Sequence, residues 1–231
     1  MYEPNRLSRY GASMYKSELE LLNKAQQLAG MTLSQVSKNQ DIILPTNLSK
    51  AKGLIGQLAE NHLGVTAPNA PEPDFPELGV ELKTLPLDIR GLPTESTYIC
   101  RCHSQFEPSW SDSRVWHKTQ RILWLPIESG PDLALGSRRF GLAQLWSPSP
   151  EQAQQMATDW EELMEALNCG DLDQTGAQHG QILQLRPKAA NSTCLHQHVG
   201  EDATLIASVP KGFYFRSSFT RSIAQSLWKC F

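Results

Sequence analysis

The segment Arg121 to Glu128, with the sequence RILWLPIE, is apolar at almost every position, and it is the feature that most constrains the fold. A strand with one solvent-facing side alternates apolar and polar residues, whereas a short continuous apolar run is typical of a strand buried on both faces. We therefore expect this segment in the centre of a β-sheet. Such a sheet has to be covered by other elements on both faces, which indicates an α/β protein with flanking helices.

Capping signals locate helices around this strand. Ser17 and Glu20 form a capping box ahead of one of them, and Ser149 followed by Pro150 is typical of the first turn of another. Glycines 30 and 64 end two of the helices. The expected helices cover residues 18–29, residues 49 or 53 to 63, residues 150–167 and residues 217–229.

Four further segments have the composition of strands, and together with the helices they predict a mixed sheet flanked by helices. These segments cover residues 80–87, 97–103, 181–187 and 203–210. A length of 231 residues suits one large domain or two closely joined lobes. No run of eighteen apolar residues is present and the start of the chain lacks a secretory signal, so we expect a cytoplasmic protein with no membrane partner.

Charge and cysteine usage add little on their own. The net charge is −3, but the stretch between Phe140 and Leu185 contains seven acidic residues and no lysine or arginine, so an acidic side and a basic side are expected. An exposed acidic helix without a partner is the simpler interpretation of that stretch. Five cysteines at irregular spacing include no C-x-x-C pair, which argues against a zinc site and favours reduced thiols, with Cys100 and Cys102 on one strand.

The strongest chemical signal is Asp74 followed by Glu81-Leu82-Lys83, after a proline-rich loop. Alternation along a strand places Glu81 and Lys83 on one face, and the chain can bend so that Asp74 approaches Glu81. Two carboxylates and the carbonyl of Leu82 could hold Mg²⁺ at a phosphodiester, while the lysine stabilises charge or orients water. This pattern is loose, and a surface strand with an exposed Glu and Lys would also produce it.

The preceding helix strengthens the hypothesis of a metal site. Gly53, Gly56 and Glu60 share one helical face, although glycine costs about 1 kcal/mol relative to alanine inside a helix. Such a face makes sense where a DNA backbone or a metal site approaches the helix closely. Glu60 would then be a third carboxylate near the metal.

Several stretches in the same order resemble the MutH family of mismatch-repair endonucleases, over most of the chain from about residue 17. The stretches are KGLIGQLAENHLG, PDFPELGVELKTLPL, RVWHKTQRILWLPIE, LWSPSPEQAQQMATDWEELME, QLRPKAAN and PKGFYFRSSF. The resemblance implies a fold like that of type II restriction endonucleases, with two closely joined lobes around a DNA cleft in a single domain over residues 1–231. The catalytic site is expected in the N-terminal lobe and DNA recognition in the C-terminal lobe.

By this resemblance, the catalytic positions are Glu60, Asp74, Glu81 and Lys83, with Mg²⁺, or Mn²⁺ as a substitute, bound by Asp74, Glu81, Leu82 and Glu60. The same resemblance assigns DNA contact or activity to Lys52 and Lys118, although either could be an ordinary surface charge. Tyr98 falls where the family can carry a phenylalanine near the bases, so this chain departs there by one hydroxyl.

The resemblance also implies which residues recognise DNA. Arg186 and Pro187 begin RPKAAN, Tyr214 lies in GFYF near the adenine, and Lys188 and Lys211 are candidates for phosphate contacts. The methyl group that separates adenine from N6-methyladenine lies in the major groove, where a closely packed side chain can reject it. Without the resemblance, Tyr214 would be interpreted as a core aromatic of a strand.

The activity that this resemblance implies is nicking of the unmethylated strand at unmethylated or hemimethylated GATC sites, by a monomer that MutL, together with MutS and ATP, stimulates. No ATP-binding loop is present in the chain itself. The acidic helix or the C-terminal segment could face MutL. Two alternatives remain open: a restriction endonuclease that cuts both strands of GATC, and a DNA-binding protein that senses methylation without catalysis.

Overall fold

The computed structural model describes residues 14–45, 53–65, 70–102, 109–168, 180–187, 196–199, 205–208 and 210–228. Its helices are α1 (Glu18–Gln26), α2 (Leu33–Asn39), α3 (Leu54–Leu63), α4 (Arg114–His117), α5 (Pro150–Asn168) and α6 (Ser217–Leu227), with a 3₁₀ turn at Leu135–Ser137. Its strands are β1 (Glu81–Leu87), β2 (Thr97–Arg101), β3 (Ile122–Glu128), β4 (Gln144–Trp146), β5 (Leu183–Pro187), β6 (His196–Val199), β7 (Leu205–Ser208) and β8 (Lys211–Phe215).

The apolar segment is β3, and it is the middle strand of a three-stranded sheet in the order β1-β3-β4. It runs parallel to β1 and antiparallel to β4, so the sheet is mixed. Every residue of β3 from Ile122 to Ile127 is buried, and only Glu128 at its end is exposed. The prediction of a central strand in a mixed sheet is therefore confirmed.

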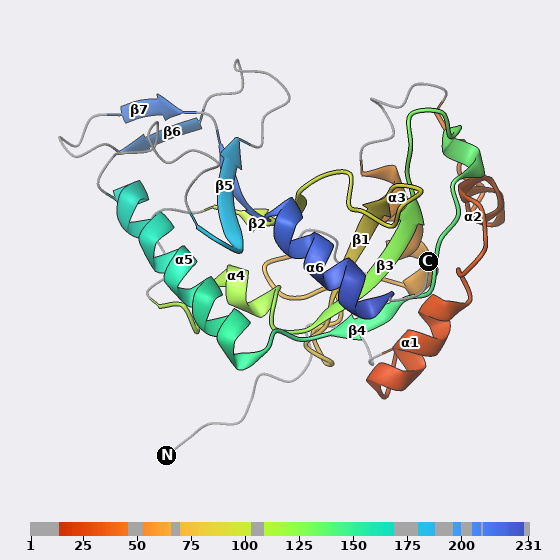
Figure 1. The fold of residues 1–231 in the computed structure, drawn as a ribbon, viewed down its shortest axis with the longest axis horizontal. Helices are drawn as coiled ribbons and strands as arrows, with labels where there is room; N and C mark the ends of the chain where they lie inside the picture. The colour runs from red at the N-terminus through yellow and green to blue at the C-terminus, as the bar shows by residue number, and fades with distance from the viewer. Residues whose placement is uncertain are drawn as a thin grey trace.

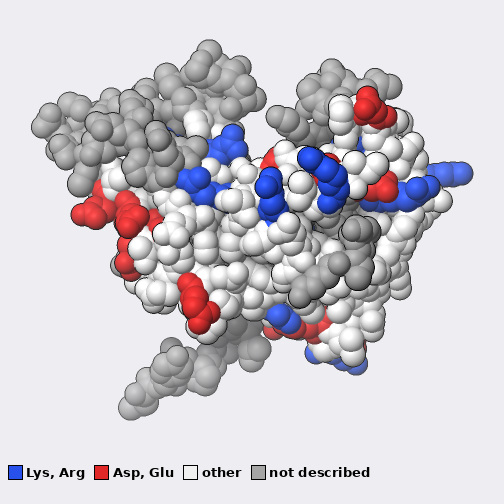
Figure 2. All heavy atoms as spheres, viewed as in Figure 1, with Lys and Arg blue, Asp and Glu red and all other residues white. Residues whose placement is uncertain are grey.

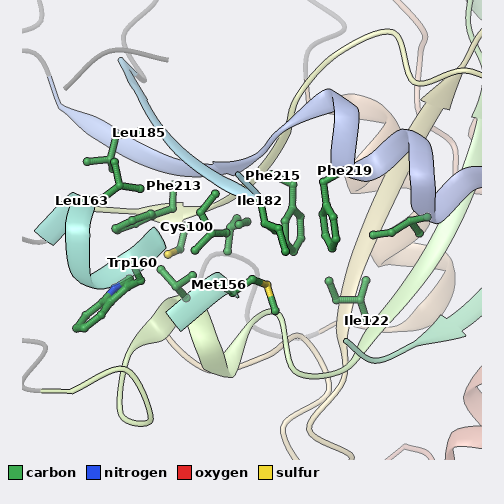
Figure 3. Close-up of a cluster of buried hydrophobic side chains, with 14 of the residues drawn as sticks. Cys100, Ile122, Met156, Trp160, Leu163, Ile182, Leu185, Phe213, Phe215 and Phe219 are labelled. Atoms are coloured by element: carbon green, nitrogen blue, oxygen red, sulfur yellow. The ribbon is translucent and has the colours of Figure 1, made fainter. Parts of the chain in front are cut away.

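The two faces of β3 pack into two different hydrophobic clusters. Ile122 and Trp124 belong to the first cluster, which also contains side chains of α5, α6, β5 and β8 and is shown in Figure 3. Leu123 and Leu125 belong to the second cluster, which is built with α1, α2 and α3. The unbroken apolar run is thus explained by a strand that supplies a core on each side.

A second sheet of three antiparallel strands, in the order β2-β8-β5, lies beside the first cluster. In GFYF, Phe213 and Phe215 point into that cluster and are 1% and 0% exposed. Tyr214 lies between them in sequence and faces the opposite side, where it is half-buried. The interpretation of Tyr214 as a core aromatic is therefore wrong, because the strand alternation buries its two neighbours instead.

The described strands form three separate sheets, whereas the sequence predicted one mixed sheet. The predicted mixed sheet is one of two three-stranded sheets, and β6 pairs with β7 as a separate antiparallel pair. Helix α2 was not predicted, although Thr32 and Gln35 form a capping box at its start that could have located it. Elements α4, β4 and β6 are three or four residues long, too short for a periodic pattern.

The helices flank the sheets as expected (Figure 1). Helix α5 lies on one side of the molecule, α1, α2 and α3 lie on the other, and α6 runs between these two sides. The predicted helix over residues 18–29 ends earlier, at Gln26, and Gly30 with a φ of 79° follows it. Within the described residues, the helices include none that is both long and apolar enough to cross a membrane.

Helix α5 is attached to β5 through a buried carboxylate. Asp159 is 1% exposed and accepts hydrogen bonds from the backbone N–H groups of Gln181, Ile182 and Leu183, at 2.6–3.0 Å. The side-chain amide of Gln155 donates a further bond of 2.9 Å to it. The interpretation of α5 as a purely solvated acidic helix is therefore wrong at Asp159, which satisfies the backbone at the start of β5.

Candidate active site

A tight turn ahead of β1 brings Asp74 back to Glu81, as the sequence predicted. Phe75 and Val80 form an antiparallel bridge, and Gly79 between them has a φ of 64°, which favours glycine. The N–H of Asp74 donates to Glu81 Oε2 at 3.2 Å, and the N–H of Leu82 donates to Asp74 Oδ2 at 3.0 Å. The two carboxyl groups are therefore held together by the backbone.

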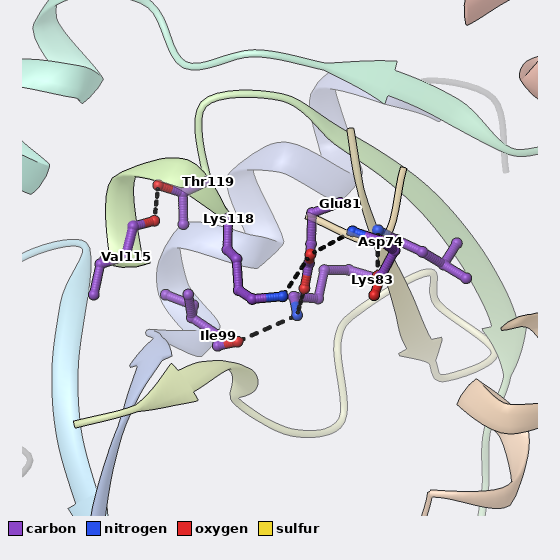
Figure 4. Close-up of polar contacts among 8 residues, drawn as sticks. Asp74, Glu81, Lys83, Ile99, Val115, Lys118 and Thr119 are labelled. Atoms are coloured by element: carbon purple, nitrogen blue, oxygen red, sulfur yellow. Dashed lines mark hydrogen bonds and ion pairs between the residues drawn. The ribbon is translucent and has the colours of Figure 1, made fainter. Parts of the chain in front are cut away.

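Glu81 forms ion pairs with two lysines (Figure 4). Lys83 Nζ lies 2.6 Å from Glu81 Oε1, and Lys118 Nζ lies 2.9 Å from Glu81 Oε2. Glu81 is 3% exposed and Lys118 is 6% exposed, so this is a buried cluster. Both the surface strand with an exposed Glu and Lys and the solvated Lys118 are therefore wrong interpretations.

Strand alternation places these groups as predicted. Val80 and Leu82 are buried in the second hydrophobic cluster, whereas Leu85 and Leu87, on the face of Glu81 and Lys83, belong to the first cluster. The charged cluster therefore occupies the start of the β1 face that further along the strand becomes part of the first core.

The charged groups in this cluster shift one another's pKa values. Burial and the neighbouring Glu81 raise the pKa of Asp74 to about 6, against the opposing effect of Lys83 and Lys118. Burial lowers the pKa of Lys83, but Glu81 and Asp74 raise it by more, so that the pKa lies above its usual value. Lys83 is therefore a cation at neutral pH.

Helix α3 brings Glu60 near the same charges. Burial raises the pKa of Glu60, and Lys83, Glu81 and Lys118 all affect it. Gly53 precedes this helix with a φ of 87°, so its backbone conformation accounts for the glycine. A methyl group on Gly56 would lie 3.8 Å from Glu60 Oε1, an ordinary contact, so the chain itself does not require a glycine there.

The groups in this site that could bind a metal ion all offer oxygen atoms. Asp74 and Glu81 offer carboxylates, and the N–H of Leu82 points away from β3 towards Asp74, so its carbonyl faces the same edge of β1. Mg²⁺ is commonly held by one or two carboxylates together with phosphate oxygens and water, so this donor set fits it. Across the described segments, no group of three Asp, Glu, His or Cys side chains is arranged to hold a metal ion.

The exposed face of the second sheet brings together three of the predicted DNA-binding residues. The guanidinium carbon of Arg186 lies 5.7 Å from the centre of the Tyr214 ring, and Tyr98 meets Tyr214 edge to face with ring centres 5.2 Å apart. A methyl group on Gly212 would lie 2.8 Å from the Tyr98 ring, so glycine is needed for this approach. Burial raises the pKa of both tyrosines, which keeps their hydroxyl groups protonated.

Strand β2 connects this face to the charged cluster. The register between β2 and β8 shifts between Tyr98 and Cys100, which leaves Ile99 as a bulged residue. The carbonyl of Ile99 accepts a hydrogen bond of 3.4 Å from Lys83 Nζ (Figure 4). Bulges commonly redirect a strand beside an active site, and here the bulge turns a carbonyl of β2 towards Lys83.

Of the other predicted DNA-binding residues, the structure describes some and leaves others outside its described range. Pro187 ends β5 and Lys211 begins β8, where the two residues are register partners. Lys52 and Lys188 lie outside the described residues. The sequence did not single out Ser96 or Gln184, which are hydrogen-bonded to each other on the face of the second sheet that carries Arg186 and Tyr214. A glutamine inside the apolar strand QILQL was a signal of a buried polar contact.

Comparison with known proteins identifies the family of the chain. Residues 63–159 match the family model described as DNA mismatch repair enzyme MutH. The DNA mismatch repair protein MutH of Shewanella sp. (strain W3-18-1) is 46% identical over 206 residues, which cover 88% of this chain and 92% of the relative. The MutH protein of Shewanella baltica (strain OS155 / ATCC BAA-1091) is 44% identical over 211 residues, covering 90% of this chain and 95% of the relative.

A more distant genus gives the same result. The DNA mismatch repair protein MutH of Serratia proteamaculans (strain 568) is 42% identical over 210 residues, which cover 90% of this chain and 92% of the relative. The chain therefore belongs to the MutH family, and it is a DNA mismatch repair endonuclease.

Proposed function

We propose that the chain uses Mg²⁺ to nick the unmethylated strand of DNA at unmethylated or hemimethylated GATC sites, and that MutL, with MutS and ATP, stimulates it. The observation that carries the proposal is the Glu81 carboxylate between Lys83 and Lys118, beside Asp74 at the edge of β1. A buried cluster of carboxylates and lysines at a sheet edge suits hydrolysis of a phosphodiester.

Asp74, Glu81 and the Leu82 carbonyl are the residues that would hold the metal, with Glu60 nearby. When bound, Mg²⁺ polarises the phosphoryl oxygen and lowers the pKa of a bound water. The charge of Glu81 is balanced by two ammonium groups in the structure, so this one carboxylate is already compensated before a cation and DNA arrive.

The ion pair between Lys83 Nζ and Glu81 Oε1, at 2.6 Å, suits an electrostatic role for this lysine. A protonated amine cannot accept a proton, but it stabilises negative charge on the phosphoryl oxygens and donates a hydrogen bond that orients water. Lys118 carries a second positive charge on the other oxygen of the same carboxylate. With a phosphate bound beside Glu81, both lysines would stabilise the charge that develops during hydrolysis.

Recognition is assigned to the exposed face of the sheet β2-β8-β5. Arg186 would contact a base edge in the major groove, and Tyr214 and Tyr98 would pack beside the adenine, where a methyl group on N6 would collide. Lys188 and Lys211 would contact phosphates, which position the protein without selecting a sequence. Figure 2 shows Lys and Arg side chains across the upper middle of one face, while Asp and Glu gather along α5.

A plasmid nicking assay tests the proposal. The substrate contains one GATC site in unmethylated, hemimethylated or fully methylated form, and the reactions contain Mg²⁺ or EDTA. We expect nicks only in unmethylated strands, faster nicking when MutL, MutS and ATP act on a plasmid with a mismatch, and no cleavage in EDTA. Linear product after one binding event would instead indicate an enzyme that cuts both strands.

Two variants connect the assay to the site. Glu81→Gln removes the shared negative charge, and Lys83→Ala removes one cation, so each should lower the nicking rate by at least about a hundredfold while DNA affinity changes little. Glu77→Gln is the matched control, because Glu77 is exposed in the same turn. Retained nicking by Glu81→Gln would overturn the site, and binding without any cleavage in the unsubstituted chain would leave a methylation-sensitive binding protein.

A further inference from the structure

Ser96 lies immediately before β2 and contacts two side chains of β5. Its hydroxyl oxygen accepts a hydrogen bond of 3.1 Å from Gln184 Nε2 and another of 3.1 Å from Arg186 Nη1. Strand β8 lies between β2 and β5 in the sheet, so these contacts reach across a whole strand. A single hydroxyl group thus joins both outer strands of the recognition face.

The contact determines where the Arg186 guanidinium lies. The side chain crosses Tyr214, with its guanidinium carbon 5.7 Å from the ring centre, and ends at the Ser96 hydroxyl. An exposed arginine samples many rotamers, and ordering it on DNA costs side-chain entropy. The Tyr214 ring lies under the guanidinium and the Ser96 hydroxyl binds its end, so both contacts hold Arg186 in one conformation before DNA binds.

Ser96 is itself held by a buried group. Gln184 is 5% exposed, and its amide nitrogen also lies 3.4 Å from the carbonyl of Phe215 in the neighbouring strand. Because the Gln184 amide is fixed by the sheet, the Ser96 oxygen that accepts from it has a defined place. Gln184 lies on the same face of the sheet as Arg186, so its fixed amide holds the Ser96 hydroxyl in place beside the exposed arginine.

The bond leaves the arginine able to contact DNA. A guanidinium has five N–H groups, and in the described part of the chain its only hydrogen bond is the one to Ser96. The remaining donors can form the paired hydrogen bonds that an arginine makes to O6 and N7 of guanine. Ser96 thus orients the guanidinium without using up the donors that a base edge requires.

We propose that Ser96 is a positioning residue that sets sequence specificity by holding Arg186 over Tyr214 for contact with a guanine. This inference rests on the proposed function, because it takes Arg186 as the residue that contacts the base. The hydrogen bonds that Ser96 makes in the described structure go to Gln184 and Arg186, and not to Asp74, Glu81, Lys83 or Lys118. Its loss should therefore weaken the choice of sequence and leave hydrolysis itself intact.

The test compares Ser96→Ala with the unsubstituted full chain on duplexes that contain GATC or a site with one base pair changed. We expect kcat/KM on GATC to fall about tenfold, as for the loss of a hydrogen bond to a charged group, mainly through KM. The ratio between GATC and the changed sites should fall with it. Ser96→Thr keeps the hydroxyl and should restore the ratio.

Matched variants separate positioning from general damage. Ser129→Ala makes the same chemical change at a serine whose hydroxyl contacts Thr94 instead of β5, and it should leave the ratio unchanged. In an Arg186→Ala background, adding Ser96→Ala should change kcat/KM by less than about twofold, because the two residues then act as one unit. Melting temperatures of all variants show whether any of them fails to fold.

Two results would overturn the proposal: an unchanged ratio in Ser96→Ala, or a full tenfold loss on adding Ser96→Ala to Arg186→Ala. A failure of the proposed function looks different, because the unsubstituted chain would then nick GATC and changed sites alike before any variant is compared. A normal preference for GATC with an unaffected Ser96→Ala would therefore reject the role of Ser96 alone.

Discussion

At the scale of single residues, Asp74 shows that the site is arranged at the expense of stability. Burial and Glu81 raise its pKa to about 6 from 3.8, so the folded protein binds the proton of this carboxyl more tightly than the unfolded chain does. The stability that it contributes is therefore present at low pH and is lost as the pH rises from about 4 through 6. At neutral pH the ionised carboxylate is destabilising when no cation is bound.

Replacing this charge should therefore stabilise the fold. In EDTA at pH 7.5, Asp74→Asn should unfold with a free energy up to about 3 kcal/mol larger than that of the unsubstituted chain. The difference should shrink as the pH falls below about 6, since the native carboxyl is then neutral too. Urea unfolding at pH 7.5 and pH 5 measures both values.

The exposed Asp132 offers the matched control, because Asp132→Asn changes the net charge equally. It should leave the unfolding free energy nearly unchanged at both pH values. A lower stability of Asp74→Asn at pH 7.5 would contradict the interpretation that the buried carboxylate is held in an unfavourable charged form.

At the scale of elements, the junction between α5 and β5 determines how β5, the strand that carries Arg186, is held. Asp159 of α5 satisfies three consecutive backbone N–H groups at the start of β5, and Arg186 lies near the end of that strand. Charged acceptors form the stronger protein hydrogen bonds, and buried N–H groups left without an acceptor are costly. The attachment of α5 to β5 therefore depends on the side chain of Asp159.

Asp159→Ala should lower the free energy of unfolding by at least about 3 kcal/mol, because two buried backbone N–H donors and a part-buried one lose their acceptor together. Glu162→Ala, on the exposed face of the same helix, should change it by less than about 0.5 kcal/mol. Chemical denaturation of both variants gives the comparison. Equal effects would show that α5 is held by its apolar stripe alone.

At the scale of the whole molecule, one strand belongs to two cores. Ile122 and Leu123 are neighbours in β3, yet their side chains lie in different hydrophobic clusters on opposite faces of the sheet. Neither cluster can lose its packing without exposing one face of the shared strand. The single domain predicted from the sequence should therefore unfold as one cooperative unit, although its helices lie on two sides.

The positions of the tryptophans make this measurable. All six lie in or against the first cluster, at residues 110, 116, 124, 146, 160 and 228. Tryptophan fluorescence therefore follows the first cluster, while amide exchange in α3 follows the second. We expect one urea midpoint from both probes. Ile122→Ala and Leu123→Ala should each lower the free energy of unfolding by about 2–5 kcal/mol, and so lower the midpoint seen by both probes. Two separate midpoints would show independent lobes.

The sequence by itself determined the local structure and the chemical type of the site. Apolar periodicity located β3, capping residues located α1 and α5, and alternation placed Glu81 and Lys83 on one face with Val80 and Leu82 behind them. These are short-range properties, set by backbone geometry and by side chains a few residues apart. For the same reason the proximity of Asp74 to Glu81 could be predicted, since one turn separates them.

Only the tertiary structure decided which distant residues meet. Lys118 lies thirty-seven positions from Glu81 in the chain, yet its ammonium group binds the same carboxylate as Lys83. Ser96 reaches Arg186 over ninety positions, and Asp159 reaches the start of β5 over more than twenty. No periodicity records such contacts, because they depend on how strands are ordered and how helices dock. The protonation state of a side chain and the direction in which it points depend on these distant neighbours, and therefore on the whole fold.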